Sequence, residues 1–278
     1  ATPALLKKLA TLGAGPEAVA GLKRAPDGKA EALFFDSVKA GATLAEGLQK
    51  ALDDTIAKLP IPKVMTYQLE QGEGANFQPG WTSEKFVRPA RGRVDLHGDQ
   101  EVQIAALGLK AGRSTVGHRF EARVEKIILL TADTYADQLL RDGAVIASFA
   151  ERRAEIVRQL TEAAAKAGTN LKPIEDDALL DEVTALVERP NVLTGRFEEA
   201  FLEVPQECLI LTMKANQKYF PLLDESGKLT NQFLIVSNIK PEDPSAVIGG
   251  NERVVRPRLA DAKFSFDQDR KKTLEPRV

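Results

Sequence analysis

Residues 219–237 read YFPLLDESGKLTNQFLIVS, in which two apolar runs flank the polar segment DESGK at 224–228. Apolar runs joined by a short segment containing Ser and Gly are typical of a β-hairpin. Successive side chains of a strand point to opposite faces, so Tyr219 and Phe220 are expected on opposite sides, with at least one of them in a core. This stretch predicts antiparallel sheet, and strand character is expected over residues 192–239.

Two helices are predicted on the N-terminal side of this hairpin. The apolar residues of 146–167 recur at helical spacing and are expected to form one buried face: Ile146, Phe149, Ala150, Ile156, Val157, Leu160 and Ala164. Gly168 is a natural end for that helix. A second apolar pattern at 179–187 predicts a helix that ends before Pro190. Helices interleaved with antiparallel hairpins favour the α+β class.

The rest of the chain divides into segments of different character. Residues 1–59 are predicted to be helical, and apolar side chains recur at helical spacing through Leu44, Leu48, Leu52, Ile56 and Leu59. Pro60-Ile61-Pro62 is expected to end this region. We therefore expect a helical segment at 1–62, a mixed antiparallel-sheet domain at 63–245 and a basic helical segment at 246–278, whose last helix begins near Pro257.

Shorter strands are expected within residues 63–145. A hairpin is predicted from 93–96 to 102–104 and a further strand at 124–130. Residues 71–80 are rich in Gly, Asn and Pro and are expected to form a loop.

Composition excludes several classes of protein. The 278 residues are 43% hydrophobic and 28% charged, typical of a globular protein, and no apolar run approaches a membrane span. No signal peptide is visible, and a cytosolic, reducing compartment fits. One cysteine and two histidines exclude an internal disulfide, a CxxC zinc site and a His-rich metal site. Cys208 heads an apolar run and is expected in the core. The net charge of −2 means that any nucleic-acid contact must come from local patches.

Three segments carry residues suited to phosphate or base contacts. The first runs from Gly108 to Phe120, and its glycines let the backbone approach a neighbour closely. Its candidate RNA-binding residues are Lys110, Arg113, His118 and Arg119, with hydroxyls from Ser114 and Thr115. Cations and exposed amides suit phosphate contacts. The alternative is a solvated surface loop.

The second segment, Met213 to Phe220, offers Lys214 and Lys218 as cations and Asn216 as a group that can contact base edges or cap backbone. Its alternative is a strand end with polar caps. The third segment, Gly249 to Phe264, concentrates Arg253, Arg256 and Arg258, whose guanidinium groups can clamp phosphate. Its alternative is a salt-bridged helix start in which Glu252 and Asp261 pair with the arginines.

Together these segments resemble the β subunit of the bacterial two-subunit glycyl-tRNA synthetases. The resemblance runs from about Trp81 to the end of the chain, with its motifs in the family's order. The matching stretches are Phe86–Pro89, Gly108–Phe120, Glu203–Glu207, Met213–Phe220, Val236–Asn238 and Gly250–Phe264. One departure is clear: after Phe-Val-Arg-Pro the family usually has a small residue and then His, whereas Ala90 is followed here by Arg91.

The resemblance implies an enzyme that joins glycine to tRNA(Gly) with ATP. It implies a cytoplasmic heterotetramer in which the α subunit carries the class II catalytic core and uses ATP with magnesium. The chain is expected to be a central fragment that lacks both ends, without catalytic residues, a metal or a cofactor of its own. It would support tRNA binding and assembly with the α subunit. Residues 63–245 are expected to resemble the B3/B4 domain of phenylalanyl-tRNA synthetase β subunits.

Two other functions stay open from the sequence. B3/B4-type domains of phenylalanyl enzymes remove wrong amino acids, so an editing hydrolase acting on mischarged tRNA is one alternative. Glycine is the smallest amino acid, so size exclusion already rejects larger ones and editing is less needed. The other alternative is a pure protein-interaction scaffold for the α subunit.

Overall fold

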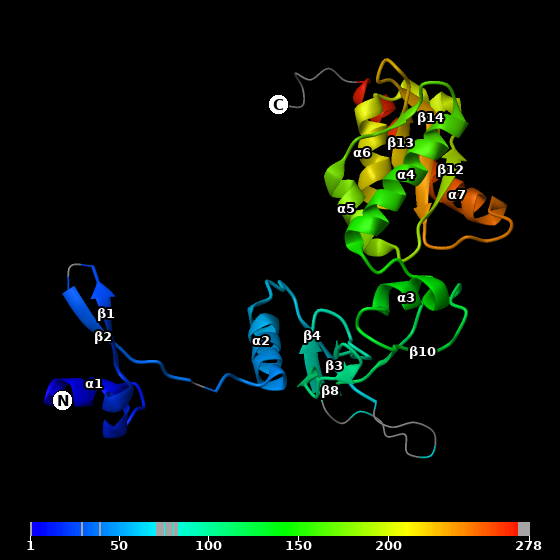
Figure 1. The fold of residues 1–278 in the computed structure, drawn as a ribbon. Helices are drawn as coiled ribbons and strands as arrows, with labels where there is room; N and C mark the ends of the chain where they lie inside the picture. The colour runs from blue at the N-terminus through cyan, green and yellow to red at the C-terminus, as the bar shows by residue number, and fades with distance from the viewer. Residues whose placement is uncertain are drawn as a thin grey trace. The chain divides into compact units, whose positions relative to one another are not determined.

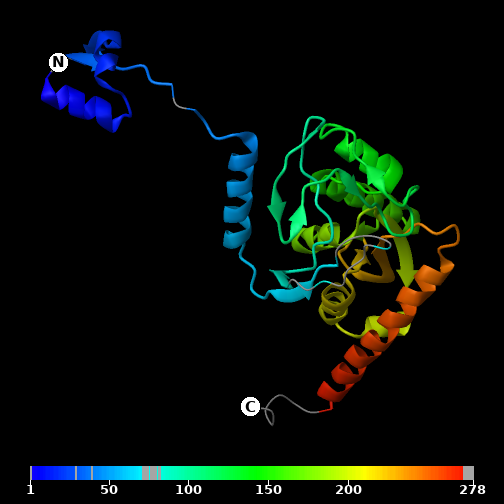
Figure 2. The same ribbon diagram turned by 90° about the horizontal axis from the view of Figure 1, so that it is seen from below.

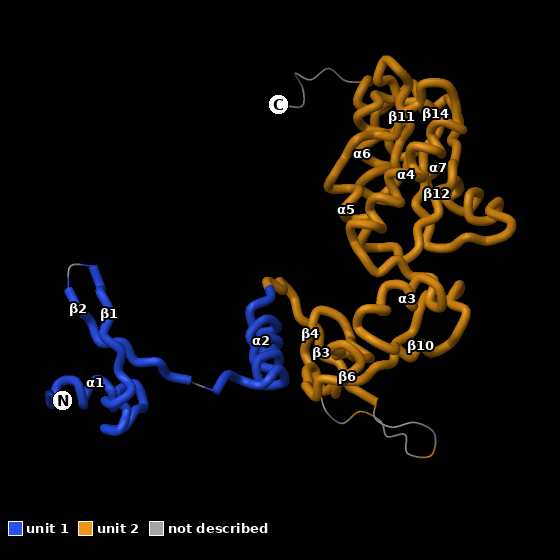
Figure 3. Tube along the Cα trace, viewed as in Figure 1, with its two compact units in different colours: residues 1–59 blue, residues 60–278 orange. Residues whose placement is uncertain are grey.

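The chain divides into two compact units, residues 1–59 and residues 60–278 (Figure 3). The computed structural model describes residues 2–28, 30–38, 40–70, 75, 80 and 83–271. Each unit is considered by itself.

The first unit combines helices with a hairpin. Its elements are α1 (Pro3–Thr11), η1 (Pro16–Gly21), β1 (Lys23–Asp27), β2 (Ala30–Phe34) and α2 (Leu44–Lys58). Helix α2 follows the predicted spacing and begins with a capping box, because Thr43 and Glu46 each bond the other's backbone amide. The prediction that residues 1–59 are helical throughout is wrong at β1 and β2. These strands pair antiparallel around Gly28, whose φ of 65° suits a tight turn.

The N-terminal part of the second unit is built from short hairpins and one helix. Its elements are β3 (Met65–Gln68), β4 (Ser83–Phe86), β5 (Leu96–His97), β6 (Gln100–Glu101), β7 (Ala105–Ala106), β8 (Leu109–Lys110), β9 (Ser114–Thr115), β10 (Ile127–Ile128) and α3 (Tyr135–Gly143). A hairpin is present near the predicted place, with Leu96 opposite Glu101, but its strands are 96–97 and 100–101 instead of 93–96 and 102–104. The strand predicted at 124–130 is only two residues long. Most of the loop predicted at 71–80 lies outside the described residues.

The remaining part of this unit is organised by a four-stranded antiparallel sheet with the order β11-β13-β14-β12. Its elements are α4 (Phe149–Ala167), β11 (Lys172–Pro173), α5 (Asp177–Leu186), β12 (Asn191–Arg196), η3 (Glu199–Glu203), α6 (Gln206–Gln217), β13 (Phe220–Leu223), β14 (Leu229–Ser237) and α7 (Ser245–Asp269). The predicted hairpin at 219–237 is confirmed as β13 and β14. The mixture of helices with small antiparallel sheets confirms the α+β class.

Helices cover both faces of this sheet (Figure 1). On one face, Phe220 and Leu234 pack with the buried residues of α4 and α5. On the other, Tyr219 and Phe233 pack with α6 and α7. Tyr219 and Phe220 therefore lie on opposite faces, as predicted, and both are buried. Because successive side chains of a strand point to opposite faces of the sheet, the apolar residues of this one hairpin contribute to two cores.

Helix α4 begins three positions after the predicted start at 146, ends at Ala167 as predicted, and confirms only part of the predicted face. Ser148 caps its first turn by accepting a hydrogen bond from the Glu151 amide, and Gly168 follows its end. Its buried residues are Ile156, Leu160 and Ala164. Phe149 and Val157 were expected to be buried and are exposed. The sheet and α5 cover a narrower stripe of the helix than its apolar residues occupy.

Three further predictions are corrected around α6 and α7. Residues 206–217 form a helix where strand character was expected, and Cys208 on that helix is exposed instead of buried. Helix α7 begins at Ser245, twelve positions before the predicted start, and continues through Pro257 (Figure 2). Proline removes one backbone hydrogen bond from a helix. Buried Val255 and Leu259 hold the helix against the sheet on both sides of that position.

Candidate nucleic-acid interface

Arg113, in the first candidate segment, is hydrogen-bonded to other residues of the protein. Its Nε donates to Glu101 Oε1 at 2.8 Å, and its Nη2 donates to the Asp99 carbonyl at 2.7 Å. Its own carbonyl accepts from the Leu129 amide at 2.8 Å. Arg113 therefore joins the β5–β6 hairpin, through its side chain, to the segment after β10, through its backbone. A guanidinium with these partners is occupied by the fold, so Arg113 is a poor phosphate ligand.

His118 is also part of the scaffold. Only 2% of it is exposed. Its Nδ1 lies 3.1 Å from the backbone nitrogens of Phe120 and Glu121 and accepts from both. The proton of a neutral ring then sits on Nε2, which donates to the Asn238 carbonyl at 2.5 Å. All of its hydrogen-bonding capacity is used inside the protein, so it offers nothing to RNA.

The two other cations of the first segment are on the surface. Lys110 on β8 and Arg119 are both exposed, and neither forms an ion pair with another residue in the described part of the chain. Arg119 lies over the Phe120 ring at 5.5 Å, and Phe120 is itself 74% exposed. The side chains of these two cations are accessible to a polyanion.

The second segment forms the C-terminal end of helix α6. The end of a strand was the alternative expected from the sequence. Lys214 forms an ion pair with Asp176, the N-cap of α5, and holds the pKa of that carboxyl below its usual range. Lys218 pairs with Glu182 at 3.0 Å and ends the helix in a left-handed conformation, with φ of 58°. Both lysines fasten α6 to α5. Asn216 is exposed.

The third segment lies in α7, where the arginines do not form one patch. Successive residues of a helix are about 100° apart, so Arg253 and Arg256 share a face and Arg258 points to another. Arg256 pairs with Glu198 at 2.5 Å. Arg253 and Arg258 are exposed and form no ion pair with any residue that the structure describes. The expected pairing with Glu252 and Asp261 is therefore wrong, and Glu252 accepts instead from the Arg196 amide at 2.8 Å.

One hydrogen bond links the second segment to the third, and the structure does not gather the ten candidates into one site. The Tyr219 hydroxyl donates to Asn251 Oδ1 at 2.7 Å, which joins the second segment to the third. His118 joins the first segment to the residue after β14. These contacts position the segments without making a shared cluster of cations.

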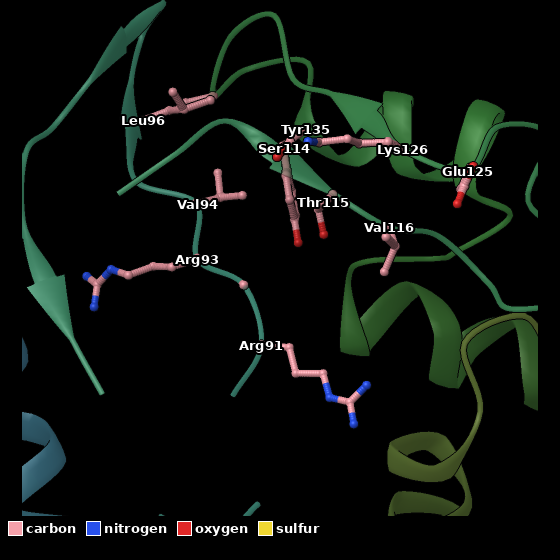
Figure 4. A pocket seen from close by; sticks show the side chains of 12 residues that line it. Arg91, Arg93, Val94, Leu96, Ser114, Thr115, Val116, Glu125, Lys126 and Tyr135 are labelled. Carbon is pink, nitrogen blue, oxygen red and sulfur yellow. The ribbon is translucent and has the colours of Figure 1, made fainter. Parts of the chain in front are cut away.

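A cleft of about 1240 Å³ lies beside the first segment (Figure 4). Its lining includes Arg91, Ser114, Thr115, Lys126 and Tyr135. Figure 4 labels Ser114 and Thr115 among the side chains that line this space together with Arg91, Arg93 and Val94. Ser114 and Thr115 belong to the predicted segment, whereas Lys126 and Tyr135 were not among the candidate residues. The departure from the family pattern at Arg91 was a further sequence signal near this cleft.

Among residues 2–28, 30–38, 40–70, 75, 80 and 83–271, no group of three or more His, Cys, Asp or Glu side chains could hold a metal ion. Over the same residues, no helix is long and apolar enough to cross a membrane.

Known proteins with similar sequences decide the family. The family model described as "Glycyl-tRNA synthetase beta subunit" matches residues 1–278. The chain belongs to the glycyl-tRNA synthetase beta subunit family. It is 74% identical over 278 residues to the "Glycine--tRNA ligase beta subunit" of Leptothrix cholodnii, and 70% identical over 279 residues to the protein of the same name in Paracidovorax citrulli.

This member of the family spans well under half the length of those relatives. Each alignment covers 100% of the chain, but 38% of the Leptothrix protein and 39% of the Paracidovorax protein. The matched region is the N-terminal part of the relatives, which corrects the expectation of a central fragment. In this beta-subunit chain, Lys110, Arg119, Arg253 and Arg258 are the candidate cations that stay exposed without an ion pair to another described residue.

Proposed function

We propose that this chain is a noncatalytic, tRNA-contacting part of a glycine–tRNA ligase beta subunit. In this proposal the whole cytoplasmic enzyme joins glycine to tRNA(Gly), and its α subunit uses ATP with magnesium. The chain contributes RNA affinity and assembly with the α subunit. The support for the enzyme is the 70–74% identity to proteins named as beta subunits of that ligase. We also propose that the helix-covered antiparallel sheet is a B3/B4-like domain.

The proposed RNA contact is inferred from a difference among the candidate cations: some are paired with carboxylates of the protein and others are not. Arg113, Lys214, Lys218 and Arg256 are held by carboxylates of the fold. Lys110, Arg119, Arg253 and Arg258 are exposed and have no such partner among the described residues. An exposed cation without an internal partner can bind a phosphate without first breaking an ion pair. These four residues are therefore the proposed phosphate contacts of this surface.

Salt-dependent binding tests the proposal. Filter binding of tRNA(Gly) to the intact ligase is measured at several salt concentrations for the wild type, Arg253→Ala, Arg258→Ala and Arg119→Ala. Each lost phosphate contact is expected to flatten the log–log salt dependence by about 0.7–0.9 and to leave the melting temperature unchanged.

Arg113→Ala is the matched control, because its guanidinium is bonded to the fold. We expect it to lower stability, with any loss of RNA binding following from that. If the three exposed variants keep the affinity and salt slope of the wild type, the RNA-facing assignment is wrong. The scaffold function would then be favoured.

The noncatalytic assignment has its own test. The purified 278-residue chain is expected to show no glycine-dependent ATP–pyrophosphate exchange and no hydrolysis of mischarged tRNA. Exchange that persists in a preparation freed of host synthetase would contradict the proposal, and so would hydrolysis of mischarged tRNA that is absent from a mock preparation.

A further inference from the structure

The cleft beside β9 has a polar lining that the fold leaves available. Ser114 and Thr115 line the cleft (Figure 4), and their hydroxyls have no side-chain hydrogen bond to another described residue. The backbone of both residues is engaged with β10, opposite Ile128 and Ile127. The strand pairing thus fixes the position of the two hydroxyls while their hydrogen-bonding capacity is free for a ligand.

Cations stand on two different walls of this cleft. Arg91 comes from the segment before β5 and Lys126 from the residue before β10, and both are exposed without an ion pair to any described side chain. Arg93 also lines the cleft, but a mostly buried ion pair with Asp95 neutralises it. Glu125 is the opposing charge. The cations that remain available to a ligand, Arg91 and Lys126, outnumber this carboxylate and favour an anion.

An aromatic ring and the size of the space narrow the class of ligand. Tyr135 at the start of α3 lines the cleft and is 42% exposed, so its ring is accessible for stacking. The volume of about 1240 Å³ exceeds the roughly 300–1,000 Å³ typical of small-molecule pockets. A space this large suits a segment of polymer. Cations beside an accessible aromatic ring are the usual means of holding single-stranded nucleic acid.

We propose that this cleft binds an unpaired segment of tRNA. Arg91 and Lys126 contact phosphates, Tyr135 stacks on a base, and the hydroxyls of Ser114 and Thr115 bond ribose 2′-hydroxyl groups. Hydroxyl recognition of the ribose distinguishes RNA from DNA. A base must be unpaired to stack on a protein ring, so a duplex is excluded as the occupant. The inference rests on the proposed function and adds a second, separate contact surface to it.

The test uses intact ligase assembled with wild-type or variant beta subunits. Two probes are titrated: tRNA(Gly), and a short fluorescein-labelled single-stranded RNA with the 3′-terminal sequence of tRNA(Gly). Arg91→Ala and Lys126→Ala are each expected to weaken binding of both probes by about threefold to tenfold and to flatten the salt slope by about 0.7. Lys172→Ala, which removes an exposed cation on β11 outside the cleft, is expected to match the wild type.

Two more variants separate a ligand contact from loss of folding. Glu125→Gln removes the opposing charge, so it is expected to tighten RNA binding by about twofold or more, an outcome that damage to the fold cannot produce. Thr115→Val keeps the shape of the side chain and removes the hydroxyl. It is expected to weaken binding of the single-stranded RNA probe and to leave unchanged the binding of a third probe, a fluorescein-labelled DNA of the same sequence.

Tyr135 provides the stacking test. Tyr135→Phe keeps the ring and is expected to bind RNA like the wild type, whereas Tyr135→Ala is expected to lose about fivefold or more. Wild-type affinity for both probes in Arg91→Ala, Lys126→Ala and Tyr135→Ala would overturn the inference. If Arg253→Ala still weakens tRNA binding in that case, the proposed function stands without the cleft. If no variant of either surface changes tRNA binding, both proposals fail.

Discussion

The His118 ring hydrogen-bonds through Nε2 to the backbone carbonyl of Asn238, 120 positions further along the chain, at 2.5 Å. Two backbone amides donate to the other ring nitrogen. The bond ties the loop after β9 to the residue that follows β14. Glu121 strengthens the same junction, because its carboxylate accepts from the Lys240 amide. A residue that the sequence offered as an RNA ligand thus holds two parts of the unit together.

Replacing His118 by Ala is expected to destabilise the protein by roughly 2–4 kcal/mol. The substitution leaves the Asn238 carbonyl and two amides without their partner in a partly buried place. The free energy of unfolding from urea titration measures the effect. His97, the chain's other histidine, is exposed on β5 and makes a matched control whose replacement by Ala should cost less than about 0.5 kcal/mol. Equal costs for the two variants would rule out the structural role of His118.

The backbone of Gly117 approaches the backbone of Gly143 too closely for a side chain. A Cβ at position 117 would lie 2.3 Å from the Gly143 Cα. Gly117→Ala is therefore expected to force the two segments apart and to cost about 1–3 kcal/mol. At Gly112 of the same loop, the nearest atom to an added Cβ is the Arg93 carbonyl oxygen at an ordinary 3.5 Å. Thermal melts of Gly117→Ala and Gly112→Ala should differ clearly, and a Gly117 variant as stable as the wild type would contradict the close approach.

The apolar face of α4 is expected to respond unevenly to truncation. Ile156 is fully buried between the sheet and α5, so Ile156→Ala should cost about 2–5 kcal/mol. Phe149 is 45% exposed, with Arg152 lying 5.9 Å from its ring, and Phe149→Ala should cost about 1 kcal/mol or less. Chemical denaturation of the two variants compares these costs. The reverse order would mean that the helix presents a different face to the core.

Tyr219 is expected to make stability fall at alkaline pH. Burial raises the pKa of its hydroxyl to about 12, because the ionised form is disfavoured inside the protein. The folded pKa lies above the ordinary value of about 10. The stabilisation is therefore complete below pH 10 and is lost as pH rises from about 10 to about 12.

Urea titrations across that range measure the difference between the wild type and Tyr219→Phe. The variant lacks the hydrogen bond to Asn251 and should lose about 1 kcal/mol at neutral pH. Between pH 10 and 12 its stability should fall by roughly 1–3 kcal/mol less than that of the wild type. Parallel curves for wild type and Tyr219→Phe would show that the hydroxyl ionises freely in the folded state.

Local patterns in the sequence determined much of the secondary structure. Helix α4 and its end at Gly168, helix α5 before Pro190 and the hairpin of β13 and β14 all follow from spacing and turn residues. These features depend on residues close in sequence, whose apolar period and caps act within one element. The same patterns failed at α6, where the apolar run of residues 208–211 occurs in a helix. A short apolar run fits a strand or a helix equally well, and here packing against α7 and the sheet decides between them.

The use of each charged side chain was decided only by the tertiary structure. Lys214 and Asp176 lie 38 positions apart in sequence and form an ion pair, whereas Arg253 and its near neighbour Glu252 do not. The cleft brings Arg91 together with Ser114, Lys126 and Tyr135 from separate segments. The sequence by itself determined which residues could carry charge, cap a helix or enter a core. Folding decided which of them are already bonded, because an ion pair depends on distance in space and not on distance along the chain.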